Sequence, residues 1–272
     1  MENVVVLLTC FNRQDKTISA IKKLNSSNQC KLKFLIVDDG STDDTVAELK
    51  KLSADIEIIN SGGNKYYTGS MRIGMEYLIK KGEKYDYLLL INDDVDFYDC
   101  IIDKLILYSK IKNNQVIVGS TIDNNKQLSY GGIHYYTRYL SAKYNIVGPN
   151  YTDCCSTFNA NCVLIPFNIF CENGIYDSHY CHGVGDFDYG LKITRNGYKI
   201  FVYKEYIGVC NRNSSKNTWQ DKSLSISKRL RFKKTPKGFR NKEMFHYYIK
   251  NFNIIVAFRY IISAYAHIFL RR

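Results

Sequence analysis

Strict alternation of apolar runs with amphipathic segments over the first hundred residues is the feature that most constrains the fold. Four runs rich in Val, Ile and Leu have the length and composition of strands buried on both faces; they lie at residues 4–8, 31–39, 55–60 and 85–93. Three segments between them carry apolar residues at helical spacing; they lie at 15–25, 42–52 and 68–82, and Thr42 or Asp43 can cap the second. This alternation predicts βαβ units and a mostly parallel sheet flanked by helices.

The remainder of the chain is less regular. A short strand is expected at residues 163–165, before Pro166, and a helix followed by a strand is expected across residues 185–203. No proline- or glycine-rich linker interrupts the sequence. We therefore predict one domain over residues 1–215 and a C-terminal extension over residues 216–272.

The cysteines and the N-terminus indicate a compartment. Nine cysteines are scattered through the chain without a C-x-x-C pair, which argues against a structural zinc site. The first residues, MENVVVLLTCFNR, have no basic stretch ahead of a short apolar run, as expected for a first strand and not for a signal peptide. We expect reduced, mostly buried thiols in a cytoplasmic protein.

Net charge is concentrated at the end of the chain. Of the formal charge of +12, residues 1–215 contribute nothing, because their 24 basic and 24 acidic groups cancel. Residues 216–272 hold 14 Lys and Arg against 2 Asp and Glu. A basic extension on a neutral body indicates an anionic partner, either membrane lipid or nucleic acid.

The last segment, FNIIVAFRYIISAYAHIFLRR, has the pattern of an amphipathic helix. Its polar residues recur at every fourth position and form one narrow stripe of Arg259, Ser263, His267 and Arg271. Because Arg259 lies near the middle of an apolar stretch of about 19 residues, a membrane span is disfavoured. We expect a helix in the plane of an anionic membrane surface, peripheral on its inner face; packing on its own domain or on a partner subunit is the alternative.

Three carboxylates crowd the end of the fourth predicted strand, where NDDVD occupies residues 92–96. Like charges this close need a compensating cation, and a hard divalent ion readily takes oxygen ligands. Mg²⁺ typically uses one or two carboxylates and leaves other positions for water and phosphate oxygens. The pattern favours a metal site, with helix capping or surface ion pairs as the alternative.

Two further acidic clusters stand at structurally informative places. VDDGSTDD at residues 37–44 ends a neighbouring strand, and the carboxyl ends of parallel strands share the sheet edge at which ligands bind. An acid there can accept hydrogen bonds from a base or from ribose hydroxyls, although these residue types also favour simple turns. Asp186 and Asp188 follow a Gly-Val-Gly loop at a predicted helix start, where they can cap the helix or present a general base to a cleft.

These pieces, in this order, resemble family 2 glycosyltransferases of the GT-A fold from residue 4 to about residue 210. TCFNR (9–13) is similar to the family's opening strand and turn, VDDGSTDDT (37–45) to its nucleotide-binding segment, and YTGSMRIGM (67–75) to its glycine-containing helix start. LLLINDDVDF (88–97) resembles its Asp-x-Asp metal motif, and GDFDYGLKITRNGYKI (185–200) the segment with the catalytic Asp. The resemblance implies an α/β GT-A fold with a nucleotide-binding half at 1–100 and an acceptor-binding half at 101–215.

The resemblance also implies roles for single residues. Nucleotide binding is expected from Thr9, Phe11, Asn12, Arg13, Asp38, Asp39, Gly69, Arg72 and Asp93, with Asp38 against the base. A Mn²⁺ or Mg²⁺ ion is expected on Asp94 and Asp96, or on Asn92 and Asp94 in the other alignment of the motif. Asp186 is expected to be the catalytic base, and the candidates for acceptor contact are His182, Asp188 and Trp219. Many relatives add a histidine ligand near the start of the tail, where this chain has Cys210 and Asn211.

The implied activity is the inverting transfer of a sugar from a UDP- or dTDP-sugar to a hydroxyl of a glycan or lipid-linked glycan in cell-surface polysaccharide synthesis. Two other classes were weighed. A sugar-phosphate nucleotidyltransferase is disfavoured because TCFNRQDK (9–16) lacks glycines for a phosphate loop. A non-catalytic protein that binds through its basic tail is disfavoured because the body is neutral, and no nucleic-acid partner is expected.

Overall fold

The computed structural model describes residues 1–270. Its large sheet begins with four parallel strands in the order β3-β2-β1-β4; they are β1 (Asn3–Cys10), β2 (Lys31–Asp38), β3 (Ile56–Asn60) and β4 (Tyr87–Ile91). The helices that connect them are α1 (Gln14–Ser27), α2 (Thr45–Leu49) and α3 (Tyr66–Lys81). The predicted βαβ organisation of the first hundred residues is thus confirmed.

The second half extends this sheet with mixed pairing. β11 (Cys162–Pro166) contains the strand expected at residues 163–165, and it lies antiparallel between β4 and β6 (Val116–Ile122). β12 (Ile200–Val209) pairs parallel to β6, and the outer positions go to β5 (Asp96–Phe97) and β7 (Leu128–Tyr130). A smaller antiparallel sheet holds β8 (Gly132–Thr137), β9 (Lys143–Val147) and β10 (Thr157–Phe158). The large sheet is therefore mixed but mostly parallel, as predicted.

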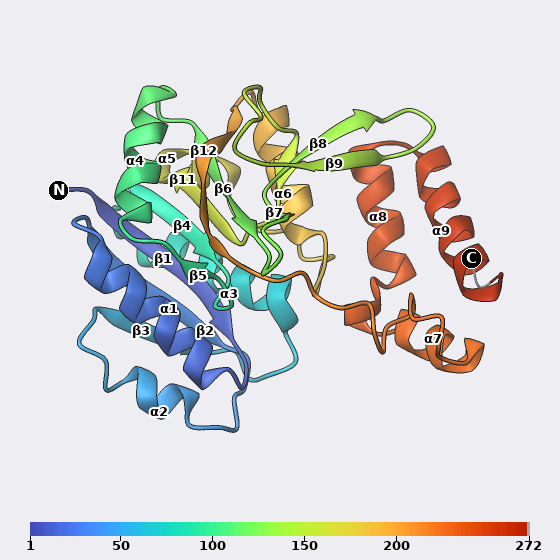
Figure 1. Ribbon diagram of the computed structural model, residues 1–272, viewed down its shortest axis with the longest axis horizontal. Helices are drawn as coiled ribbons and strands as arrows, with labels where there is room; N and C mark the ends of the chain where they lie inside the picture. The colour runs from blue at the N-terminus through green and yellow to red at the C-terminus, as the bar shows by residue number, and fades with distance from the viewer. Residues whose placement is uncertain (271–272) are drawn as a thin grey trace.

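Helices cover both faces of the large sheet (Figure 1). One face packs against α1 and α4 (Ile101–Ile111), and the other against α3, α5 (Phe167–Asn173) and α6 (Gly185–Arg195). The apolar run of β1 serves both layers, because Val4 and Val6 point to α1 while Val5 and Leu7 point to α3. Gly74 allows the close approach of α3, since a Cβ there would lie 2.3 Å from a Leu7 methyl group.

The second predicted helix is shorter than expected. It was expected across residues 42–52, whereas α2 ends at Leu49 and the chain then turns. Asp43, one of the two expected caps, accepts a hydrogen bond from the Thr45 N–H at 3.1 Å. The apolar face of this helix was expected to continue to Leu52, but Leu49 is its only fully buried apolar residue. A single turn of helix is therefore enough to bury it.

The C-terminal extension folds onto the rest of the chain. It contains α7 (Ile226–Lys233), a 3₁₀ turn (Pro236–Gly238), α8 (Asn241–Asn251) and α9 (Ile254–Phe269), which lie together at one end of the molecule (Figure 1). Met244 and Tyr247 of α8 pack against Ile133 of β8 and Leu191 of α6. Among the described helices, none has the length and apolar character needed to cross a bilayer.

The polar stripe predicted for the last helix is only partly in solvent. Arg259 and Ser263 are exposed, but the ring of His267 packs edge-on against Trp219. Arg271, the last member of the stripe, lies outside the described residues. α9 therefore packs one face on its own chain, which was the alternative to a membrane role, and leaves another face exposed.

Candidate active site

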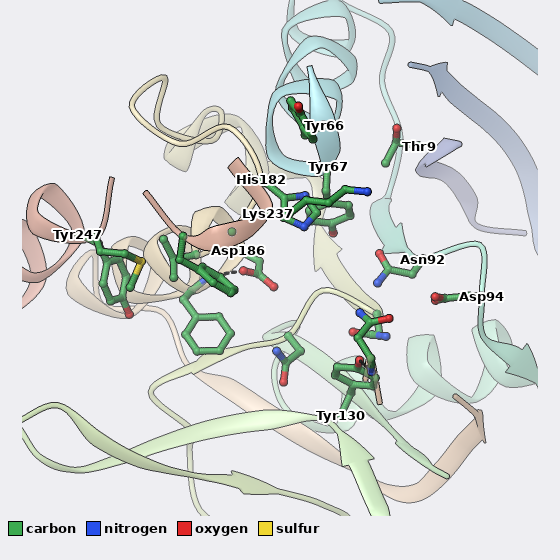
Figure 2. Close-up of a pocket in the computed structure, with 18 of the residues that line it drawn as sticks. Thr9, Tyr66, Tyr67, Asn92, Asp94, Tyr130, His182, Asp186, Lys237 and Tyr247 are labelled. Atoms are coloured by element: carbon green, nitrogen blue, oxygen red, sulfur yellow. Dashed lines mark hydrogen bonds between the residues drawn. The ribbon is translucent and has the colours of Figure 1, made fainter. Parts of the chain in front are cut away.

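A cavity of about 910 Å³ opens at the carboxyl ends of β1 and β4. Its volume is that of a site for a large small-molecule ligand. The N-terminus of α6 and the extension close the side opposite these strands (Figure 2). Eleven of the residues expected in the site line the cavity: Thr9, Phe11, Asn12, Arg13, Asp39, Asn92, Asp93, Asp94, His182, Asp186 and Trp219. Five others, Asp38, Gly69, Arg72, Asp96 and Asp188, lie outside its lining.

The crowded carboxylates after β4 are balanced by Arg13. One guanidinium nitrogen, Nη1, lies 2.8 Å from Asp93 Oδ1 and 3.2 Å from Asp94 Oδ2. Asp93 also accepts a hydrogen bond from the Thr17 hydroxyl at 3.0 Å. Burial raises the pKa of Asp93 above its usual value, and the Arg13 charge opposes that rise. Arg13 thus supplies part of the positive charge that the sequence pattern led us to expect from a metal ion.

Asp94 lines the cavity and is more exposed than Asp93 beside it. Its Oδ1 atom receives only a weak contact from the Cys210 thiol, whose sulfur lies 3.7 Å away. Burial, together with the Asp94 charge, raises the pKa of Cys210 to about 12, so the thiol is protonated and donates to Asp94. Cys210 thus contacts Asp94 near the start of the tail, where relatives were expected to offer a histidine.

Asn92 lines the same cavity as Asp94, and its side-chain amide is directed into that cavity (Figure 2). Its Oδ1 atom is buried and finds no hydrogen-bond partner among residues 1–270. An amide oxygen and a carboxylate oxygen suit Mg²⁺ or Mn²⁺, which keep further positions for phosphate oxygens. The residues present therefore fit a divalent ion in the Asn92–Asp94 alignment. Asp96, expected as a ligand, is exposed on β5 outside the cavity, because that strand pairs with β12 at the sheet edge.

Of the two acids at the end of β2, Asp39 lines the cavity and Asp38 does not. Asp38, expected against the base, is buried and accepts hydrogen bonds from the Gly40 and Ser41 amides of its own turn. Asp39 lines the cavity and accepts hydrogen bonds from the backbone N–H groups of Lys65 and Tyr66 at 2.9 and 2.8 Å. These two residues stand at the N-terminus of α3, so Asp39 fixes the start of this helix next to the cavity.

The turn after β1 forms the adjoining wall. Asn12 adopts a left-handed conformation with φ of 51°, and its Oδ1 atom accepts the Thr42 amide at 2.7 Å. The Thr9 hydroxyl donates to the Val37 carbonyl at 2.9 Å. Phe11 projects beyond them with 53% of its surface exposed. These contacts tie the ends of β1 and β2 together and present one aromatic side chain at the cavity rim.

Gly69 and Arg72 act beneath the cavity rather than in it. The Gly69 amide donates to the Cys181 carbonyl at 3.0 Å, and Arg72 Nη1 donates to the Tyr180 carbonyl at 3.2 Å. Arg72, which was expected to bind the nucleotide, lies outside the cavity lining. Both residues hold the loop before α6 against α3, and that loop carries His182 into the cavity.

Asp186 faces the cavity from the first turn of α6 (Figure 2). Its Oδ2 atom accepts the Ala160 amide at 3.1 Å and its Oδ1 atom accepts the Phe187 amide at 2.9 Å. Burial nevertheless raises the pKa of Asp186 to about 6, with these amides opposing the rise. A carboxylate with such a pKa is ionised near neutral pH and basic enough to accept a proton from a hydroxyl that reacts.

His182 and Lys237 line the same cavity as Asp186 (Figure 2). Burial, and secondly the Lys237 charge, lowers the pKa of His182 to about 4, so its ring is neutral at physiological pH. His182 Nδ1 is buried without a hydrogen-bond partner among the described residues. Lys237 forms no ion pair within residues 1–270. Sequence reasoning missed Lys237, because nothing distinguishes it from the other lysines of the basic extension.

The remaining acceptor candidates are engaged elsewhere. Asp188 is buried and binds Lys250 Nζ and Asn251 Nδ2 of α8, each at 2.7 Å. Trp219 lines the cavity but is only 8% exposed, and Lys233 Nζ lies 5.3 Å from the centre of its ring. Asp188 thus joins α6 to α8, and one face of Trp219 is occupied by a cation of its own chain.

Aromatic side chains from distant segments line the cavity beyond Asp186. They are Tyr135, Tyr144, Phe187, Tyr247, Tyr248 and Tyr260. The hydroxyls of Tyr135 and Tyr247 are 2.9 Å apart, which joins β8 to α8. Asn159 adds a buried Oδ1 atom that has no partner within the described range. This wall is largely uncharged and rich in flat surfaces, in contrast to the acidic wall around Asp94.

Comparison with solved structures identifies the fold. The chain aligns with a mannosyltransferase from Pyrobaculum calidifontis in complex with GDP-Man and Mn²⁺, at 11% identity and a TM-score of 0.59, over 97% of this chain and 69% of that one. GalNAc-T7 with UDP, GalNAc and Mn²⁺ aligns at 16% identity and a TM-score of 0.60, over 78% and 44% of the two chains. TarS of S. aureus aligns at 11% identity and a TM-score of 0.57, over 78% of this chain and 37% of TarS.

The chain therefore spans well under half the length of TarS. No curated protein matches it by sequence. The model of one sequence family does match, over residues 5–163, which includes both acidic clusters after β2 and β4. This match covers more than half of the chain, and together with the GT-A fold it shows that the chain belongs to glycosyl transferase family 2.

Proposed function

We propose that the chain transfers a sugar from a nucleoside diphosphate donor to a hydroxyl of a glycan or lipid-linked glycan, with inversion at the anomeric carbon. The observation that carries this proposal is Asp186. Its enclosed carboxylate, with a pKa of about 6, lies in the same cavity as the oxygens of Asn92 and Asp94. That arrangement suits one base at the acceptor and one wall at the donor that can hold a divalent ion against the diphosphate.

The donor lies on the acidic wall in this proposal. The nucleoside is held among the cavity-lining residues Thr9, Phe11, Asn12, Arg13 and Asp39. Asn92 and Asp94 hold the divalent ion, and when bound it would neutralise charge on the diphosphate as the bond to the sugar breaks.

Asp186 removes the acceptor proton. The acceptor oxygen attacks the anomeric carbon while its proton passes to the carboxylate, and the diphosphate departs with the electron pair of the broken bond. A single displacement of this kind inverts the configuration and needs no second carboxylate. Lys237, without an ion-pair partner in the described chain, faces the same space and supplies positive charge for the departing phosphate oxygens.

The aromatic wall beyond Asp186 supports a sugar as the acceptor. Flat apolar surfaces and hydroxyls, with little fixed charge, suit a carbohydrate better than an ionic group. We further propose that the reaction serves cell-surface polysaccharide synthesis in the cytoplasm. The free thiols of all nine cysteines, which lie within residues 1–270, support a reducing compartment.

The test is a thermal-stability panel of UDP-, dTDP- and GDP-sugars, each with Mn²⁺ and with EDTA. A ligand that binds only the folded state at a hundredfold excess over its Kd stabilises by about 2.7 kcal/mol, which is about 5 °C for a domain of this size. We expect one nucleotide to raise the Tm, and only with metal. No rise with any donor in a folded sample would refute the proposed function.

A further inference from the structure

α9 turns an apolar stripe away from the molecule. Val256, Ala257, Ala264 and Ile268 are buried against the chain. The opposite side exposes Ile255, Phe258, Ile262 and Phe269 by 46%, 51%, 66% and 53% of their surfaces. Their spacing of three, four and seven residues places them on one face of the helix. Ile254 and Leu270 widen the stripe at its two ends.

The stripe is held in place by a buried arginine. Arg229 of α7 is fully buried, and its guanidinium donates to the carbonyls of Trp219, His267 and Ile268 at 2.8, 3.1 and 2.9 Å. The last turn of α9 is thereby capped by a positive charge. The helix is thus fixed with its apolar stripe outward and does not need a partner to order it.

The part of the extension next to α9 is cationic. Arg259 borders the stripe on α9, and Lys228, Arg231 and Lys234 are exposed on or just after α7, which packs against the buried side of α9. The acidic groups within residues 216–270 are two, and neither offsets this charge. Glu243 is buried and pairs with Arg240, and Asp221 accepts hydrogen bonds from its own loop.

We propose that this face of α9 docks on an anionic lipid bilayer. A helix lying in the interface buries such a stripe at the boundary of headgroups and acyl chains while nearby Lys and Arg meet anionic lipid. A second copy on the same face would bring two strongly basic surfaces together, which charge repulsion opposes. A nucleic acid would satisfy the cations and leave the stripe in water.

Docking at this face is independent of sugar transfer. If both hold, the bilayer lies against the extension that also closes the cavity, and an acceptor carried on a lipid would reach the enzyme from that surface. α9 has 16 residues, about 24 Å at 1.5 Å per residue, which is enough to lie along a headgroup layer.

The experiment is cosedimentation of the full chain with phosphatidylcholine vesicles, with and without phosphatidylglycerol. The test variant is Phe258→Gln with Ile262→Gln. The matched control is Leu107→Gln with Ile111→Gln, which removes side chains that are 61% and 66% exposed on α4 at the other end of the molecule (Figure 1). We expect salt-sensitive binding to anionic vesicles, at least tenfold weaker for the α9 variant and unchanged for the control.

Three outcomes would overturn the proposal. They are no binding by the wild type, equal binding by the α9 variant, and a wild-type dimer that the α9 variant converts to a monomer. The Tm of each variant shows whether it is folded, and exposed positions lose little packing on substitution. The donor-dependent Tm rise, measured on the same samples, separates the two proposals: if it persists without vesicle binding only docking fails, and if vesicle binding persists without it only the proposed function fails.

Discussion

Replacing Asp186 with Asn should remove turnover and stabilise the folded protein at neutral pH. The folded state keeps a proton on Asp186 up to pH about 6, whereas the unfolded chain releases it near the ordinary value of 3.8. The wild type therefore loses stability as the pH rises between these two values. A shift of about two pKa units corresponds to about 3 kcal/mol, an upper bound because cavity water screens the carboxylate.

Asn carries no charge but cannot accept both amides. Asp186 accepts the N–H groups of Ala160 and Phe187 through its two oxygens, and Asn replaces one of these oxygens with a donor. The protonated carboxyl that the folded wild type holds below pH 6 has the same limit, because one of its oxygens carries the proton. The two proteins should therefore differ little in stability at pH 4, and at pH 8 the variant should be more stable by up to about 3 kcal/mol.

The assay is urea unfolding of both proteins at pH 4, 6 and 8. All other titrating groups are shared, so their contributions cancel in the difference between the two free energies of unfolding. A difference that keeps one value across this pH range would show that the Asp186 carboxyl is not destabilised by burial, and the reasoning from its environment would be wrong.

Three further substitutions test other parts of the site. Asp94→Asn should abolish the metal-dependent Tm rise with a donor, while Asp96→Asn should retain it because that residue is outside the cavity; equal loss in both would contradict the Asn92–Asp94 site. Lys237→Met should weaken nucleoside diphosphate binding in calorimetry by about tenfold, with Lys234→Met unchanged; equal affinities in both would remove Lys237 from the site. Arg229→Met should lower the free energy of unfolding by about 3 kcal/mol, since three carbonyls lose a charged donor; a urea midpoint equal to that of the wild type would refute this.

Local pattern predicted the strands and helices of the first half well, because each run of β1–β4 is short, apolar and bounded by turns. It also placed Asp186 at a helix start facing a cavity. The sequence alone shows that Asp186 and Asp188 do not lie in the same site. Residues two apart on a helix point about 200° away from each other, so both cannot face one cavity. In the structure Asp188 faces α8 instead.

The features that could not be predicted from the sequence depend on contacts between residues far apart in the chain. The charge balance of Asp93 and Asp94 comes from Arg13, about eighty positions earlier in the chain, and no local pattern links them. The same holds for Lys237, which reaches the cavity only because the extension folds back over α6. The contacts of Arg72 could not be read from local pattern for a related reason, since its carbonyl partners belong to a loop more than a hundred residues away.

The most direct test of the account is the rate of nucleoside diphosphate release from the bound donor, measured against pH for the wild type and for Asp186→Asn. The account predicts that the wild-type rate rises through pH about 6 as the carboxylate ionises. It predicts that the variant binds the donor with the same Kd and releases nucleoside diphosphate at least a hundredfold more slowly. A variant that turned over at the wild-type rate, or a wild-type profile flat across pH 6, would contradict the assignment of Asp186 as the base.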